Sequence, residues 1–78
     1  MRKGLRIENN FYLNMDAIIT WRVSSEGISI MTSAKTENNR FLVTTKEPEL
    51  GTFPLYFIVS IQEVKRIIKE INEYMDID

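Results

Sequence analysis

The chain has 78 residues, of which 44% are hydrophobic and 27% charged, and its formal net charge is −1. This composition excludes a disordered chain and allows one core, so we expect a single domain over residues 1–78. Cysteine and histidine are absent. Their absence excludes disulfides and every metal site or catalytic triad that is built on these residue types.

The apolar runs are short, and the longest, such as residues 53–59, are far below the roughly 20 residues that a membrane-spanning helix needs. Polar residues near the start interrupt any signal-peptide core. We therefore expect a cytoplasmic protein with no membrane partner. Frequent isoleucine, asparagine, lysine and glutamate are typical of proteins from AT-rich bacteria and their phages.

Residues 5–59 favour short strands divided by turns. The expected strands cover residues 5–8, 11–13, 17–24, 28–33, 40–46 and 55–59. Asn9-Asn10 is expected to form a tight hairpin turn in the left-handed conformation that asparagine tolerates. Gly27 is expected to supply a positive φ to the next turn. Asn14 and Asp16 favour a corner, because their side chains bond to nearby backbone.

The strand over residues 17–24 has the clearest alternation. One face carries Ala17, Ile19, Trp21 and Val23, and the other carries Ile18, Thr20, Arg22 and Ser24. Trp21 has two interpretations, a stacking platform or interface anchor and a core residue. The alternation favours the core, because Trp21 shares its face with Ile19 and Val23.

One amphipathic helix is expected over about residues 60–76. Ser60 and Glu63 have capping-box spacing, in which each side chain bonds to the backbone N–H of the other. An apolar stripe follows at helical spacing, made of Ile61, Val64, Ile67, Ile68, Ile71, Tyr74 and Met75. We expect the opposite, charged side of the helix to face solvent. The fold class is therefore α+β: a curved antiparallel sheet or small roll of five to six strands, with one C-terminal helix.

The sheet face that the helix does not cover is more apolar than a solvent-facing sheet usually is. Such a patch on a small domain commonly marks an interface. The candidate interface residues are Ile18, Arg22, Met31, Leu42 and Tyr56. We expect a protein partner or a homodimer, with Ile18, Met31 and Leu42 central.

The longest irregular stretch, residues 46–54, is a second candidate surface, because long loops on a rigid scaffold often carry recognition. Its candidate residues are Glu47, Glu49 and Phe53. The alternative interpretation is a plain crossover between sheet edges. A small-ligand pocket between this loop and the helix is a further alternative.

A nucleic-acid-binding module is the first alternative function. Its basic residues would be Arg2, Lys3, Arg6, Arg22 and Arg40. The sequence pI of about 5.4 argues against it, because nucleic-acid-binding domains usually have a net basic footprint.

No pair of carboxylates falls in an expected pocket, so we expect no catalytic residue, no cofactor and no metal. The sequence thus favours a non-catalytic protein–protein interaction module, such as a small phage or bacterial accessory or inhibitor protein acting as a homodimer or a subunit.

Overall fold

The computed structural model describes residues 4–35, 39–49, 53 and 55–77, and it confirms the α+β class with a single C-terminal helix. Within this part no helix has the length and apolar character needed to cross a membrane. The elements in chain order are β1 (Gly4–Glu8), β2 (Phe11–Asn14), the 3-10 turn η1 (Met15–Ala17), β3 (Ile18–Val23), β4 (Gly27–Thr32), β5 (Arg40–Thr44), β6 (Tyr56–Ile58) and α1 (Ile61–Tyr74).

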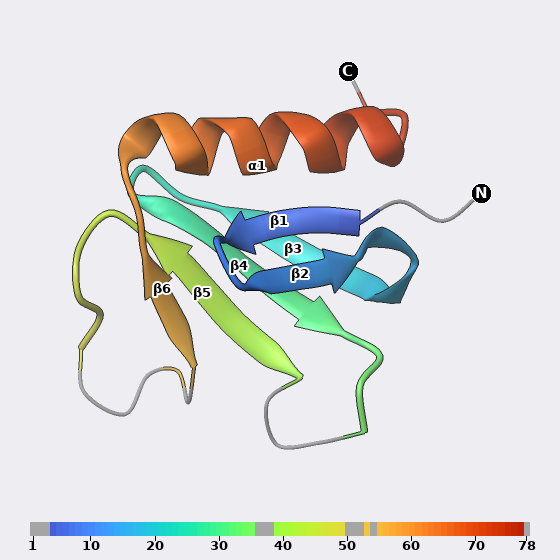
Figure 1. Ribbon diagram of the computed structural model, residues 1–78, viewed down its shortest axis with the longest axis horizontal. Coiled ribbons are helices and arrows are strands. Elements are labelled where there is room, and N and C mark those ends of the chain that lie inside the picture. Colours follow the sequence, from blue (N-terminus) through green and yellow to red (C-terminus); the bar gives the residue numbers. More distant parts are fainter. Residues whose placement is uncertain (1–3, 36–38, 50–52, 54, 78) are drawn as a thin grey trace.

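The strands form two sheets (Figure 1). β1 and β2 make an antiparallel hairpin, and the second sheet has the order β3-β4-β5-β6. β3, β4 and β5 pair antiparallel as expected, but β6 runs parallel to β5. The sheet is therefore mixed, because β6 begins at the same end of the sheet as β5.

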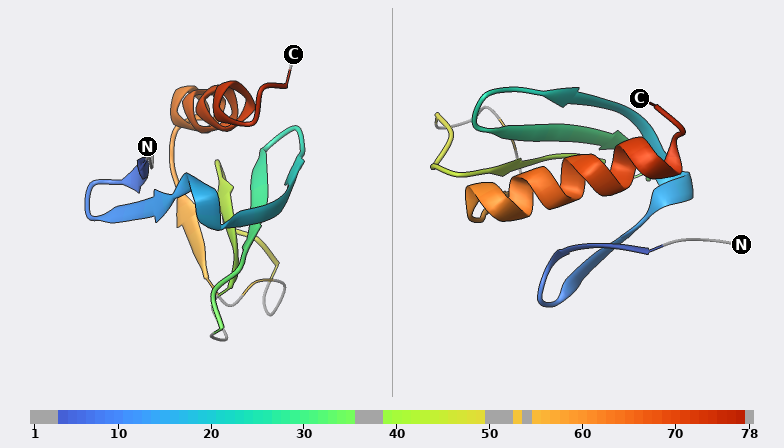
Figure 2. Two further views of the ribbon diagram at one scale, coloured as in Figure 1. Left: turned by 90° about the vertical axis from the view of Figure 1, so that its right-hand side faces the viewer. Right: turned by 90° about the horizontal axis from the view of Figure 1, so that it is seen from above.

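The helix and the β1–β2 hairpin lie side by side on one face of the four-stranded sheet (Figures 1 and 2). The Phe11 ring of the hairpin lies with its centroid 4.7 Å from that of Phe57 and 5.7 Å from that of Phe41. The hairpin, the four-stranded sheet and the helix thus share one hydrophobic core. Its buried apolar residues are Leu5, Ile7, Met15, Ile18, Ile28, Ile30, Phe41, Val43, Phe57, Val64, Ile67 and Ile71.

A β-bulge at Ile19 changes the expected faces of β3. Ile18 pairs with Thr32, but the next pair is Thr20 with Met31, so Ile19 is an extra residue. Ile18 is therefore turned into the core and is 9% exposed, whereas Ile19 is 55% exposed. The prediction of Ile18 as an interface residue is wrong for this reason. Trp21 packs against the core.

Two turns have a different backbone from the one expected. Asn9-Asn10 does join β1 to β2, but among the described residues other than glycine only Asp76 has a positive φ. Gly27 does not take the left-handed conformation either. Glycine is required there by space, because a Cβ atom would overlap the carbonyl oxygen of Val43. The corner is as expected, since the Asn14 side chain accepts from the Asp16 N–H at 3.0 Å.

Both helix ends are capped. Ser60 is the N-cap, and its hydroxyl accepts from the Glu63 N–H at 3.3 Å. At the other end, the N–H of Ile77 donates to the carbonyl of Asn72, and the N–H of Asp76 donates to that of Glu73. These two bonds and the left-handed Asp76 (φ 57°) make a Schellman motif.

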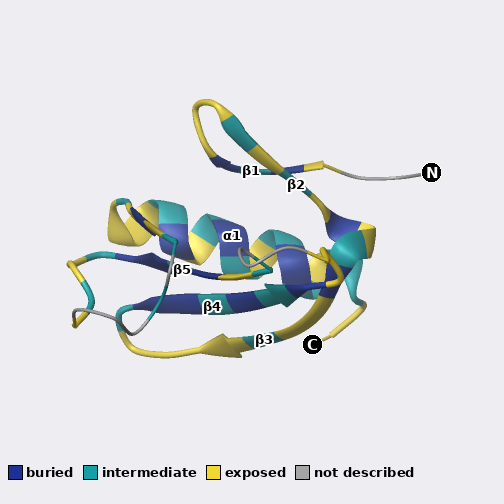
Figure 3. Ribbon diagram, turned by 90° about the horizontal axis from the view of Figure 1, so that it is seen from below, coloured by how far each residue is buried: buried dark blue, intermediate teal, exposed yellow. Residues whose placement is uncertain are grey.

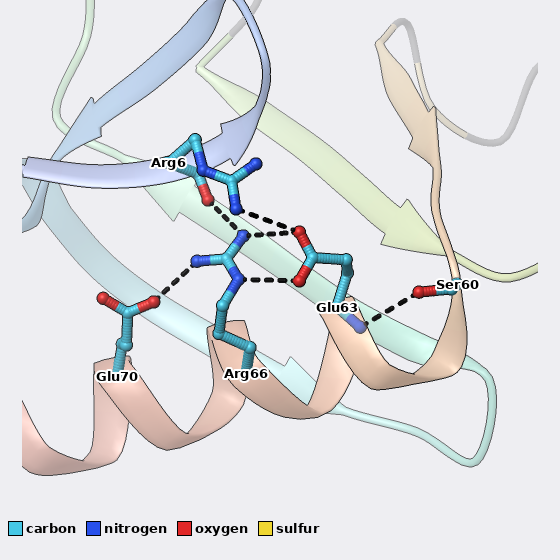
Figure 4. Close-up of polar contacts among 5 residues, drawn as sticks. All are labelled: Arg6, Ser60, Glu63, Arg66 and Glu70. Carbon is cyan, nitrogen blue, oxygen red and sulfur yellow. Dashed lines mark hydrogen bonds and ion pairs between the residues drawn. The ribbon is translucent and has the colours of Figure 1, made fainter.

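The Glu63 carboxylate does not return to the cap as the capping box predicted. It accepts from Arg66 at 2.9 and 3.2 Å and from Arg6 at 3.2 Å (Figure 4). Arg66 also donates to Glu70 at 2.6 Å and to the backbone carbonyl of Arg6 at 2.7 Å. This part of the helix is therefore not a plain solvated face, because Arg66 joins it to β1.

Replacing Asp76, the left-handed residue of the Schellman motif, by glycine should stabilise the protein. Glycine takes a positive φ without the steric cost that a Cβ atom imposes. We expect Asp76→Gly to raise the free energy of unfolding by about 0.5–1 kcal/mol and Asp76→Val to lower it, measured by urea denaturation. Equal midpoints for the three proteins would contradict this account of the helix end.

Replacing Arg66, whose guanidinium donates to several acceptors at once, should weaken the contact between the hairpin and the helix. A lysine at this position cannot reach Glu63, Glu70 and the Arg6 carbonyl together. Arg66→Lys should therefore cost about 1–2 kcal/mol of the free energy of unfolding. The control is Lys69→Ala, which breaks a 4.0 Å pair between side chains that are 79% and 60% exposed and should cost less than about 0.5 kcal/mol.

The Glu63 carboxylate should make the free energy of unfolding sensitive to acid. The hydrogen bonds from Arg66, together with its charge and that of Arg6, lower the pKa of Glu63 below its ordinary value of 4.5. The stability from this group is complete above pH 4.5 and is lost as the pH falls through the lowered pKa. Wild type should lose more unfolding free energy than Glu63→Gln between pH 7 and pH 3. Parallel losses in the two proteins would exclude Glu63 as the titrating group.

Candidate functional site

The candidate site is the face of the four-stranded sheet opposite the helix, which we call the outer face. Strand register places three cross-strand rows on it. The rows are Thr20–Met31–Arg40, Arg22–Ser29–Leu42–Tyr56 and Gly27–Thr44–Ile58. These positions alternate with the buried residues that face the helix, such as Ile30 and Val43, so the period-2 pattern of the strands creates this face.

One end of the outer face is a basic hollow of about 540 Å³. Arg22 on β3 and Arg40 on β5 line it, with Met31 on β4 between them. The Arg40 guanidinium carbon lies 5.3 Å from the ring centroid of Phe53, which places it within cation–π range. No acidic side chain is among the described residues that line this hollow.

The other end is an acidic hollow of about 510 Å³. Glu26, Glu47 and Glu49 line it beside Leu42, and the only cation in its described lining is Lys46, which pairs with Glu26 at 3.0 Å. The Tyr56 hydroxyl donates to Glu47 at 3.3 Å. The charge of Glu47 raises the pKa of Tyr56, so this phenol stays protonated and remains a donor.

The structure brings the two surfaces predicted from the sequence together. Arg22, Met31, Leu42 and Tyr56 share the outer face, and residues 46–49 and 53 border it. Phe53 belongs to the basic hollow, whereas Glu47 and Glu49 belong to the acidic one. The sheet face and the loop were alternatives in the sequence, but they form a single surface.

The basic residues proposed for nucleic acid are divided between two sides of the molecule. Arg22 and Arg40 converge in the basic hollow. Arg6 lies on β1, and its side chain is paired with Glu63 of the helix. Arg2 and Lys3 lie outside the described residues. Among the described basic residues, Arg6 therefore does not join Arg22 and Arg40 in one surface.

Glu26 of this surface was missed in the sequence, whereas Lys46 belongs to the candidate stretch 46–54. Glu26 and Lys46 look like isolated charges in a turn and after a strand. They meet because the Thr45 N–H donates to the Glu26 carbonyl at 3.0 Å, next to the pairing of Gly27 with Thr44. The proximity of Glu26 and Lys46 follows only from the register between β4 and β5. The alternation of residues in the sequence does not determine that register.

A third hollow, of about 460 Å³, lies on the helix side of the molecule. The Asn9-Asn10 turn, Val59 and Glu63 contribute to it. Among the described residues the helix thus shares a hollow with the hairpin turn, while residues 46–49 and 53 border the outer face. In the same part of the chain no group of three or more acidic side chains is placed to hold a metal ion.

Comparisons of the chain with protein-family models, with curated proteins and with solved structures found no match.

Proposed function

We propose that this chain is a non-catalytic interaction module that binds a protein partner through its outer face. The observation that carries the proposal is the arrangement of that face. Met31 and Leu42 are half-buried apolar residues at its centre, with the basic hollow at one end and the acidic hollow at the other.

The residue types support a protein partner. Interface centres are enriched in Arg, Met, Tyr and Phe, all of which occur on this face or at its border. The partner would carry an apolar centre, an acidic group facing Arg22 and Arg40, and a basic group facing Glu47 and Glu49. Opposed charges of this kind fix the orientation of two surfaces and speed their association.

A nucleic acid is the second candidate, because two arginines and the Phe53 ring meet in one hollow. Such a hollow can hold phosphate and stack a base. A longer strand would extend towards Glu47 and Glu49, where like charge opposes it. This opposition is the reason that we favour the protein partner.

The outer face can be tested with matched variants of the purified chain used as bait in a lysate of its source organism. Leu42→Ser and Arg40→Glu should reduce capture of the partner about tenfold or more, since an interface anchor contributes about 2 kcal/mol. The control is Lys69→Glu, a charge reversal on an exposed helix residue, which should leave capture unchanged.

Two results would contradict the proposal. One is equal loss of capture in Lys69→Glu and in the outer-face variants. The other is captured material that nuclease removes, with binding that falls steeply with salt and depends on Arg40 but not on Leu42, which would support the nucleic-acid alternative.

A further inference from the structure

A second surface, separate from the outer face, lies along β3. This strand is at one edge of the four-stranded sheet, and none of the described residues pairs with its free side. The view from above in Figure 2 and the view in Figure 3 agree that β3 forms one side of the molecule, with the β1–β2 hairpin on the other. A free edge of this length is a template for another strand.

The backbone groups that face the free side follow from the hydrogen-bond pattern. The Ser24 N–H donates to the Gly27 carbonyl at 2.8 Å, so this pair is hydrogen-bonded across β3 and β4. Because bonded and non-bonded pairs alternate in an antiparallel ladder, Arg22 and Thr20 also bond towards β4. The N–H and C=O groups of Trp21 and Val23 therefore point away from the sheet.

The side chains of this edge are apolar and exposed. Ile19 is 55% exposed and Val23 is 51% exposed, and they flank the partly buried Trp21. The residues that commonly protect an edge, proline and lysine, are absent from β3, whose single charge is Arg22. The bulge at Ile19 leaves residues 20–23 in regular register. The opposite edge differs, because β6 has only three residues.

We propose that a second copy of this chain pairs antiparallel with β3, with the two-fold axis at Trp21. This register brings the outward N–H and C=O groups of Trp21 against those of the second copy. It also sets Thr20 opposite Arg22 of the second copy, within the regular stretch 20–23, and leaves the bulged Ile19 beside Val23 of that copy at the end of the pairing. A register centred on Arg22 would instead place two arginines directly opposite each other, which is unfavourable. The strand is thus complementary to itself.

The resulting dimer has one continuous eight-stranded sheet. Its axis is perpendicular to the sheet, so both helices lie on one side and both outer faces on the other. Pairing along β3 therefore leaves the outer face free for the partner proposed above. That proposal rests on Met31, Leu42 and the two hollows, whereas the pairing rests on the outward backbone groups of Trp21 and Val23.

The absence of cysteine allows a direct test of the register. Thr20 and Arg22 of the second copy form a non-bonded pair with Cα atoms about 4.5 Å apart, within reach of a disulfide. Two copies of either residue are about 8 Å apart, which is beyond that reach. A mixture of Thr20→Cys and Arg22→Cys, one of them tagged, should therefore cross-link on mild oxidation mainly as the mixed dimer.

The control for random collision is Lys69→Cys, on the exposed side of the helix. Cross-linking of the mixture no greater than that of Lys69→Cys, or cross-linking of each variant alone as readily as the mixture, would overturn the register.

Sedimentation of matched variants tests the edge itself. Wild type should be a dimer at micromolar concentration. Val23→Pro removes only an outward N–H and should give a folded monomer by far-UV circular dichroism, while Val23→Thr keeps that N–H and should remain a dimer. If Val23→Pro does not fold, Ile19→Lys provides the same test. A monomeric wild type, or a dimer that survives both edge variants, would overturn the proposal.

The two proposals can fail separately. Leu42→Ser should lose the protein partner and remain a dimer, whereas Val23→Pro should lose the dimer. A dimer that depends on Leu42 and not on Val23 would place the second copy on the outer face and overturn pairing along β3.

Discussion

The structure depends on the docking of the β1–β2 hairpin beside the helix on one face of the sheet. A two-stranded hairpin is at best marginally stable alone, so its order rests on the contacts of Phe11 with Phe41 and Phe57. Arg66 adds a polar link on the same side, between the helix and the carbonyl of Arg6. Because both covering elements occupy one face, the other face is left to carry Met31, Leu42 and the two charged hollows.

The two proposed surfaces have different physical origins. The outer face is uncovered because the described elements outside the sheet pack on its opposite side, and its charges are divided by strand register. The β3 edge is free because the hairpin and the helix lie near the other strands, so the backbone of Trp21 and Val23 is left without a neighbour among the described residues. One surface would recognise side chains, while the other would recognise mainly backbone.

Much of the fold was predictable from local pattern. Alternation identified the strands, and Ser60 with the apolar stripe identified the helix and its cap. The errors come from interactions that a local pattern does not contain. One extra residue in β3 turned Ile18 into the core, against the expected alternation. The Glu63 carboxylate accepts from Arg6, 57 positions away, as well as from Arg66, in place of closing the cap. The loop residues Glu47, Glu49 and Phe53 lie beside Leu42 and Arg40 because β6 pairs with β5, and this register is not visible in a local pattern.

The link between Arg66 and Arg6 also has a kinetic consequence. It joins residues that are 60 positions apart, whereas the β1–β2 and β3–β4 hairpins pair residues that are close in the chain. The entropy of closing a loop grows with its length, so we expect the hairpins to be cheap to form and their union with the helix to be the costly event. The outer face lies mainly on the locally paired strands, while the core behind it depends on contacts between distant segments. The surface proposed for recognition and the interior that supports it would then belong to different stages of folding.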